Sequence, residues 1–153
     1  MARVKIKLIK PLWYQRPIID ALEGVEYKYV VGCLSRRIGK SILAKNFLVK
    51  YALTHDNACI GYVTPTSDLS RKFIKALVKA LKGTNAIEAS NLTDKFIEFT
   101  NGSIVYFMSA ESGDNNRGSG FDLLIYDEAA YIGDDVYNYV FKAMEMQAKK
   151  VLL

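Results

Sequence analysis

A short segment near the N-terminus has the residue types and order of a phosphate-binding loop. It reads Ser35-Arg36-Arg37-Ile38-Gly39-Lys40-Ser41. In such loops the backbone N–H groups at the start of the following helix point at phosphate oxygens. The lysine reaches the β- and γ-phosphates, and the serine hydroxyl ligates Mg²⁺. The full signature has glycine six residues before the lysine, where this chain has Leu34. The segment therefore predicts a nucleotide-binding loop with one departure from the usual pattern.

Two consecutive acids supply the other half of a hydrolytic site. Asp127 and Glu128 follow the apolar run 123–126. We expect Asp127 to hold Mg²⁺, directly or through the coordination sphere of Ser41. We expect Glu128 to orient and deprotonate a water molecule aimed at the γ-phosphate. An acid pair alone can equally open a surface turn, but together with the loop it predicts nucleotide hydrolysis.

Three arginines could act on the same phosphates. Arg36 and Arg37 lie inside the loop, and we expect one of them to contact the γ-phosphate and the other to face solvent. Arg117 lies in the polar, glycine-rich segment 111–120. There it could neutralise transition-state charge in its own subunit or in a neighbouring one. The alternative for Arg117 is a solvated loop charge.

A glutamine with aromatic neighbours precedes the loop, in Trp13-Tyr14-Gln15-Arg16. Its amide offers both a donor and an acceptor, as an adenine edge requires. A neighbouring ring could stack on the base. The alternative is a segment that only packs against the domain, and the residues alone favour that alternative.

Alternating strands and helices would carry these residues. The apolar pattern predicts strands at 27–33, 58–63, 121–126 and 151–153, and helices at 40–51, 69–81 and 136–147. Asn101-Gly102 predicts a hairpin at about residues 95–109, with both turn residues at positive φ. This order predicts an α/β fold of the P-loop NTPase type, with a mostly parallel central sheet flanked by helices. Because ligands bind at the carboxyl ends of parallel strands, the loop and the acid pair should converge on one pocket.

Composition and charge limit the class of protein. The 153 residues suit a single domain, and no apolar run approaches the roughly 20 residues that span a bilayer. Cys33, Cys59 and His55 fit neither a disulfide framework nor a zinc site, so we expect a reduced, cytosolic chain. The net charge of +5 concentrates in residues 1–10 and 67–82, whereas residues 111–135 are acidic. Basic flanks suit a polyanionic partner, and ordinary solubility is the alternative.

The loop and the acid pair resemble those of large terminase subunits, the DNA-packaging motors of tailed bacteriophages. The family's Walker A loop commonly lacks the first glycine and carries arginine, as residues 35–41 do here. Other segments are similar to the family and stand in its order: residues 14–16, 61–66, 96–108, 117–118 and 124–132. The resemblance covers residues 12–153.

The resemblance implies ATP and Mg²⁺ as cofactors and a role for each matched residue. Lys40 and Ser41 would bind phosphate and metal, Asp127 would bind metal, and Glu128 would be the catalytic base. In the same way Arg117 would act across subunits.

Further implications concern the base of the nucleotide and the partners. Gln15 would read adenine. The partners would be double-stranded DNA, the portal protein, the small terminase subunit and further copies in a ring, with no membrane. The protein would work in the cytoplasm of the infected bacterial host, docked transiently on the procapsid.

The family has a coupling segment and a C-terminal nuclease domain that would follow Leu153. We therefore expect residues 1–153 to be a single P-loop ATPase domain that is incomplete at its C-terminus. We expect no DNA cleavage from this chain and inefficient hydrolysis.

Two other classes stay open. The first domain of a DExx-box helicase shares the glutamine segment and the acid pair, although a working helicase needs a second such domain. A non-hydrolysing nucleotide- or DNA-binding module would use the basic residues of the helix expected at 69–81. These are Arg71, Lys72, Lys75, Lys79 and the following Lys82. A solvated helix face is the plainer interpretation of the same residues.

Overall fold

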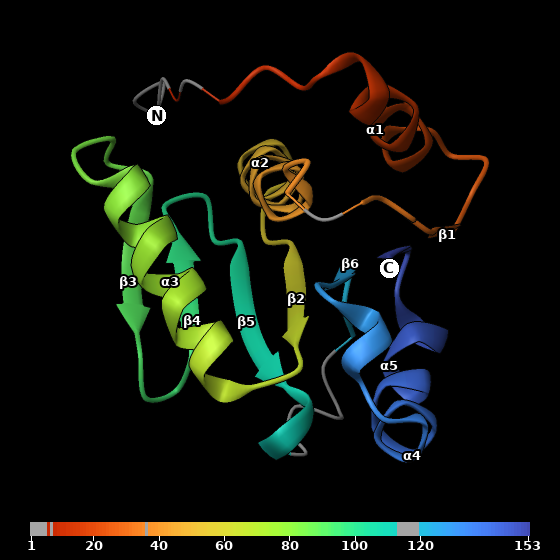
Figure 1. Cartoon of the computed structure of the whole chain (residues 1–153). Helices are drawn as coiled ribbons and strands as arrows, with labels where there is room; N and C mark the ends of the chain where they lie inside the picture. Colours follow the sequence, from red (N-terminus) through yellow and green to blue (C-terminus); the bar gives the residue numbers. More distant parts are fainter. Residues whose placement is uncertain (1–5, 7, 36, 113–119) are drawn as a thin grey trace.

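A mixed seven-stranded sheet forms the centre of the molecule, which we describe from a computed structural model (Figure 1). The structure describes residues 6, 8–35, 37–112 and 120–153. Its strands are β1 (Tyr29–Val30), β2 (Cys59–Thr64), β3 (Ile87–Asn91), β4 (Phe96–Phe99), β5 (Ile104–Ser109), β6 (Leu123–Tyr126) and β7 (Lys150–Leu152). They lie in the order β1-β7-β6-β2-β5-β4-β3. The first five of these are mutually parallel, and β4 runs antiparallel to both of its neighbours, β5 and β3. The expected mostly parallel sheet with a hairpin is therefore confirmed.

Helices cover both faces of this sheet. The longer ones are α1 (Arg16–Glu23), α2 (Lys40–Thr54) and α3 (Ser67–Leu81). The chain from 134 to 147 is one helical stretch made of α4 (Asp134–Val136), a π-helical turn η4 (Tyr137–Phe141) and α5 (Lys142–Gln147). Short 3₁₀ turns are η1 (Trp13–Gln15), η2 (Ala110–Ser112) and η3 (Ala129–Tyr131). The three helices predicted from the sequence are all present, the last with a π turn inside it.

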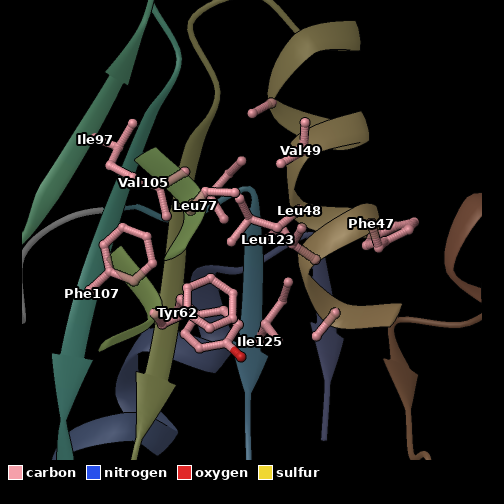
Figure 2. Close-up of a cluster of buried hydrophobic side chains, with 14 of the residues drawn as sticks. Phe47, Leu48, Val49, Tyr62, Leu77, Ile97, Val105, Phe107, Leu123 and Ile125 are labelled. Atoms are coloured by element: carbon pink, nitrogen blue, oxygen red, sulfur yellow. The ribbon is translucent and has the colours of Figure 1, made fainter. Parts of the chain in front are cut away.

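Two hydrophobic layers hold the helices to the sheet. Alternate residues of β6 face opposite sides, so Leu123 and Ile125 join the layer under α1, α2 and α3, whereas Leu124 and Tyr126 join the layer under α5. Figure 2 shows the first layer, with α2 side chains packed against the buried sheet residues. Because both faces are covered, β6 is buried along its whole length, as its continuous apolar run predicted.

Helix α3 has one buried side and one charged side. Phe73, Ile74 and Leu77 are buried against the sheet. The Thr66 side chain accepts a hydrogen bond from the Leu69 N–H at 3.3 Å, which caps the helix. This cap explains why α3 starts at Ser67, slightly earlier than the apolar pattern predicted.

The hairpin between β4 and β5 has a different turn from the one predicted. Only Gly102 of the expected turn pair has a positive φ, of 81°. The Gly102 N–H donates to the Phe99 carbonyl at 2.9 Å, and the Phe99 N–H donates to the Ser103 carbonyl at 2.8 Å. The loop is thus a longer turn closed by a glycine bulge. The Asn101 side-chain amide donates to the Ala52 carbonyl at 2.8 Å. This bond restrains Asn101 in the observed turn.

Three elements near the edges differ from the prediction. The strand expected at 27–33 is reduced to β1, because only Tyr29 and Val30 pair with β7. Helix α1 was not predicted, although Pro17 at its first turn is a start signal. Strand β3 was not predicted because its polar residues have low strand propensity, and pairing with β4 stabilises it. In the described part of the chain, none of the helices has the length and apolar character needed to cross a bilayer.

Candidate nucleotide site

The phosphate-binding loop leads directly into α2. Gly39 precedes the helix with φ 84°, and a Cβ there would lie 3.1 Å from the Gln15 Nε2. Both observations explain why glycine stands at this position. Among the described residues no side chain caps the start of α2, so the first N–H groups of the helix stay open to an anion. Lys40 and Ser41 occupy the first two positions of the helix, beside those N–H groups.

The acid pair stands at the carboxyl end of β6. The Asp127 N–H donates to the Val63 carbonyl at 2.9 Å, which extends the pairing of β6 with β2 beyond the strand. Glu128 follows in the left-handed conformation, with φ 59° and ψ 43°. A non-glycine residue held there costs on the order of 1–3 kcal/mol, and such residues gather at functional sites.

The two motifs meet at neighbouring hollows on the carboxyl edge of the sheet. A hollow of about 300 Å³ is lined by Lys40, Asp127 and Glu128. Another of about 400 Å³ is lined by Ser41, Asp127, Glu128 and the start of α3. A third, of about 450 Å³, is lined by Arg37, Gly39, Lys40, Ser41 and Glu128. The convergence expected from the sequence is thus present in the structure.

Most charged groups of this site are not paired within the protein. Among the residues that the structure describes, the side chains of Lys40, Ser41 and Glu128 make no hydrogen bond or ion pair. A cation, a hydroxyl and a carboxylate around shared hollows therefore remain free for a ligand. This arrangement suits a charged, phosphate-bearing ligand.

Asp127 is the exception, because it has a partner that the sequence analysis missed. The Tyr62 hydroxyl, from β2, donates to the Asp127 Oδ2 at 2.7 Å. Burial, followed by the charge and hydrogen bond of Asp127, raises the pKa of Tyr62 well above 10. The phenol is therefore a permanent donor near neutral pH. Its only sequence signal was a tyrosine inside an apolar strand, and that signal is ambiguous.

Gln15 is built into the loop rather than left open. Its Nε2 donates to the Ile38 carbonyl at 3.1 Å and to the Gly39 carbonyl at 3.4 Å, and its Oε1 accepts from the Leu12 N–H at 3.0 Å. The Tyr14 hydroxyl also donates to the Ile38 carbonyl, at 3.2 Å. Gln15 is 5% exposed. In this structure the glutamine segment takes the packing role weighed in the sequence analysis, and adenine reading by Gln15 stays a prediction.

Of the remaining predicted residues, the structure describes Ser35, Arg37 and Ile38. Ser35 and Arg37 are exposed on the loop, and Arg37 has a φ of 64°. Ile38 is half-buried and contributes its carbonyl to the bonds just described. Arg36 and Arg117 lie outside the described residues.

The donor atoms present fit a magnesium ion better than a transition metal. Within residues 6, 8–35, 37–112 and 120–153 no group of three or more His, Cys, Asp or Glu side chains could hold a metal. Asp127 and Ser41 instead offer a carboxylate and a hydroxyl oxygen beside one hollow. Mg²⁺ prefers oxygen ligands and usually combines one or two carboxylates with water and substrate phosphates.

Comparison with known proteins places this site in context. Residues 31–148 match the family described as terminase large subunit, T4likevirus-type, N-terminal. The large terminase subunit of Escherichia phage T5 is 36% identical over 134 residues, which are 84% of this chain and 30% of that protein. This chain therefore spans less than a third of the length of that relative.

Solved structures share the fold. The large terminase ATPase domain of Thermus phage P74-26 has a TM-score of 0.72 at 22% identity, over 94% of this chain and 64% of that one. The large terminase of a thermophilic bacteriophage, in complex with ATP-gamma-S, has a TM-score of 0.62 at 19% identity, over 92% and 35%. The UvsW helicase of bacteriophage T4 has a TM-score of 0.65 at 15% identity, over 94% and 51%.

Proposed function

Because the chain belongs to the family of N-terminal regions of T4-like terminase large subunits, we propose that it binds ATP with Mg²⁺ and hydrolyses it to move double-stranded viral DNA into a capsid. The observation that carries this proposal is the convergence of Lys40 and Ser41 with Asp127 and Glu128 on shared hollows. The helicase alternative is not retained, because the family is that of terminases.

The loop and α2 bind the triphosphate. The N–H groups at the start of α2 and the Lys40 ammonium neutralise the β- and γ-phosphates. The loop around these phosphates is formed by Ser35, Arg37, Ile38 and Gly39. We assign Arg36 to the γ-phosphate because the guanidinium of an arginine in this loop could neutralise it. Asp127 and Ser41 would hold Mg²⁺, which when bound would supply positive charge to offset that of the phosphates.

The acid pair divides two tasks. Asp127, together with the Ser41 hydroxyl, offers oxygen ligands for the metal. Glu128 stands one residue further, and its carboxylate makes no hydrogen bond or ion pair among the described residues, so it is free to accept a proton from the attacking water. Arg117 would stabilise the transition state, in its own subunit or from a neighbour. Hydrolysis that rises steeply with protein concentration and is lost in Arg117→Ala would identify the second case.

Nucleotide binding tests the proposal most directly. We would measure the affinity of a fluorescent ATP analogue with Mg²⁺ for the wild type, Lys40→Ala and Lys79→Ala. Lys79 is an exposed lysine of α3 away from the hollows, so it controls for the loss of one positive charge. We expect binding to be lost in Lys40→Ala and kept in Lys79→Ala. Equal binding by the wild type and Lys40→Ala would overturn the proposal.

The proposed partners are double-stranded DNA, the portal protein, the small terminase subunit and other copies of the subunit in a ring. The charged side of α3 offers one surface for DNA. Its cations are exposed, and among the residues that the structure describes only Lys72 of this set has an ion-pair partner, Asp68 at 3.1 Å.

DNA binding without hydrolysis is the second candidate function, and the same exposed side of α3 favours it. Such binding would weaken steeply with salt, because each phosphate contact releases counterions. It would also be indifferent to Lys40→Ala. DNA affinity measured against salt concentration in that variant separates this candidate from the ATPase.

A further inference from the structure

We propose that Tyr62 is a positioning residue of the nucleotide site, which holds the Asp127 carboxylate in one orientation for the metal. The hydroxyl engages Oδ2 at 2.7 Å and leaves Oδ1 as the oxygen for a cation. This inference rests on the proposed function, because it needs Asp127 to serve as a magnesium ligand.

Strand order and register bring the two residues together. β2 and β6 are parallel neighbours, and Tyr62 lies opposite Ile125. Ile125 and Asp127 are two residues apart and point to the same face of the sheet, and so does Tyr62. Asp127 therefore lies diagonally ahead of Tyr62, toward the carboxyl edge. A tyrosine is long enough to place its hydroxyl at this diagonal position, and a shorter side chain opposite Ile125 would not reach it.

Aromatic packing fixes the ring that carries the hydroxyl. The Tyr62 ring centroid lies 4.0 Å from that of Phe73 on α3 and 5.9 Å from that of Phe107 on β5. Figure 2 shows Tyr62 next to Phe107 and Ile125 in the buried layer. Tyr62 is fully buried, so its hydroxyl has no access to bulk water and needs an acceptor inside the protein. Asp127 is that acceptor, and the ring cannot turn the hydroxyl elsewhere without repacking.

The bond matters because a free carboxylate can rotate. The terminal torsion of aspartate is broad, so an untethered Asp127 would populate many orientations. Hydrogen bonds to metal-ligating side chains hold the ligand in place, and their loss typically costs roughly 10–100-fold in metal affinity or activity. We therefore expect Tyr62 to govern how much Mg²⁺ strengthens nucleotide binding, and to leave metal-free binding unchanged.

The test removes the hydroxyl and keeps the ring. We would measure the dissociation constant of a fluorescent ATP analogue with saturating Mg²⁺ and with EDTA, for the wild type, Tyr62→Phe and Tyr106→Phe. Tyr106 is a half-buried tyrosine of β5 whose ring contacts Phe121 and which does not line the hollows, so it is the matched control. We expect Tyr62→Phe to reduce the Mg²⁺-induced gain by about 10-fold or more, toward no gain at all. The constant in EDTA should not change, and Tyr106→Phe should behave as the wild type.

Three results would overturn the inference. They are an unchanged Mg²⁺ gain in Tyr62→Phe, an equal weakening with and without Mg²⁺, and an equal loss in Tyr106→Phe. A double-mutant cycle separates positioning from folding: in an Asp127→Ala background, Tyr62→Phe should have no further effect on the Mg²⁺ gain, and a further loss contradicts positioning. A wild type that binds no nucleotide would overturn the proposed function together with this inference, whereas an unchanged gain in Tyr62→Phe overturns the inference alone.

Discussion

The two ends of the parallel strands carry similar charged residues in opposite arrangements. At the amino end, the Asp122 Oδ2 accepts from the Cys59 N–H at 2.9 Å, and its Oδ1 lies 2.7 Å from the Lys149 Nζ. The neighbouring Lys150 Nζ donates to the Ala21 carbonyl at 3.3 Å. At the carboxyl end, Lys40 has no such partner among the described residues.

The pKa shifts at the amino end reflect these contacts. Burial alone would raise the pKa of Asp122, but the hydrogen bonds from Lys149 and from the Cys59 backbone outweigh it and lower that pKa. Burial, followed by the charge of Asp122, raises the pKa of the Cys59 thiol to about 11, so the thiol stays protonated at neutral pH. Charged groups at the amino end are thus held by contacts within the fold, whereas at the carboxyl end the side chains of Lys40 and Glu128 make no hydrogen bond or ion pair among the described residues. This difference between the two ends predicts that substitutions at one end change activity and that substitutions at the other change stability.

The largest expected effect is at the carboxyl end. Glu128→Gln should lower ATP hydrolysis by roughly 10²–10⁴-fold, because the general base is lost, and should leave nucleotide binding intact. Phosphate release at matched protein concentration measures it. Glu88→Gln, on an exposed position of β3, is the control and should match the wild type. Equal rates for Glu128→Gln and the wild type would remove Glu128 from the mechanism.

Asp122→Ala should show the reverse behaviour at the amino end. It leaves the partly buried Cys59 N–H without its acceptor, so we expect a loss of about 1–3 kcal/mol in the free energy of unfolding, whereas the exposed Lys149 ammonium stays solvated. ATP-analogue binding should not change. Urea unfolding gives the stability, with Asp20→Ala on the exposed side of α1 as the control. A loss of nucleotide binding without a loss of stability would break the division between the two ends.

Glu128→Gly should raise stability by about 1 kcal/mol, since glycine adopts positive φ without strain. The same variant should not hydrolyse ATP. Ala130→Gly, nearby in η3, is the control and should lose stability instead, because its backbone has no positive φ to relieve. Thermal unfolding of both variants would show whether the backbone at Glu128 is held in a strained conformation. A lower stability for Glu128→Gly would contradict that strain.

Low pH should reduce the stability of the fold through the protonation of Asp122. The folded-state pKa of Asp122 lies below its unfolded value, so its contribution to stability is present above the unfolded pKa of about 3.9 and is lost as pH falls through the folded pKa. We would measure the free energy of unfolding in urea between about pH 5 and pH 2.5. It should fall more steeply with decreasing pH for the wild type than for Asp122→Asn. Parallel pH profiles would refute this contribution.

The smallest effect is expected for an exposed ion pair. The Lys50 Nζ lies 2.5 Å from the Glu23 Oε1, but the two side chains are 48% and 42% exposed. Lys50→Ala should cost about 0.2–1 kcal/mol, and salt should reduce the difference. Unfolding at low and high salt measures it. If Lys50→Ala lost as much free energy of unfolding as Asp122→Ala, exposed ion pairs would not contribute less than part-buried charged contacts, contrary to this expectation.

Much of the site was predictable because its signals are local. Gly39-Lys40-Ser41 joins a loop residue to the start of helix α2, and both signals span only a few residues. The acids 127–128 follow an apolar run typical of a strand covered on both faces. Because parallel strands have their carboxyl ends at one edge of the sheet, the sequence predicted that the two motifs would lie close together.

Contacts between strands and between distant segments were not predictable. The bond from Tyr62 to Asp127 depends on β2 lying beside β6, and the sequence does not state strand order. The amide of Gln15 had two plausible partners, adenine and backbone, and only the approach of η1 to the loop selects the backbone in this structure.

The amino-acid sequence by itself determined most of the helices and buried strands, though not α1 or β3, together with the two motifs and the edge at which they meet. Periodicity, helix starts and buried runs are properties of neighbouring residues. The tertiary structure alone decided the turn at Gly102, the packing of Gln15 and the partner of Asp127. Each of these depends on which distant backbone or side chain is within hydrogen-bonding reach, and that choice is made when the layers pack.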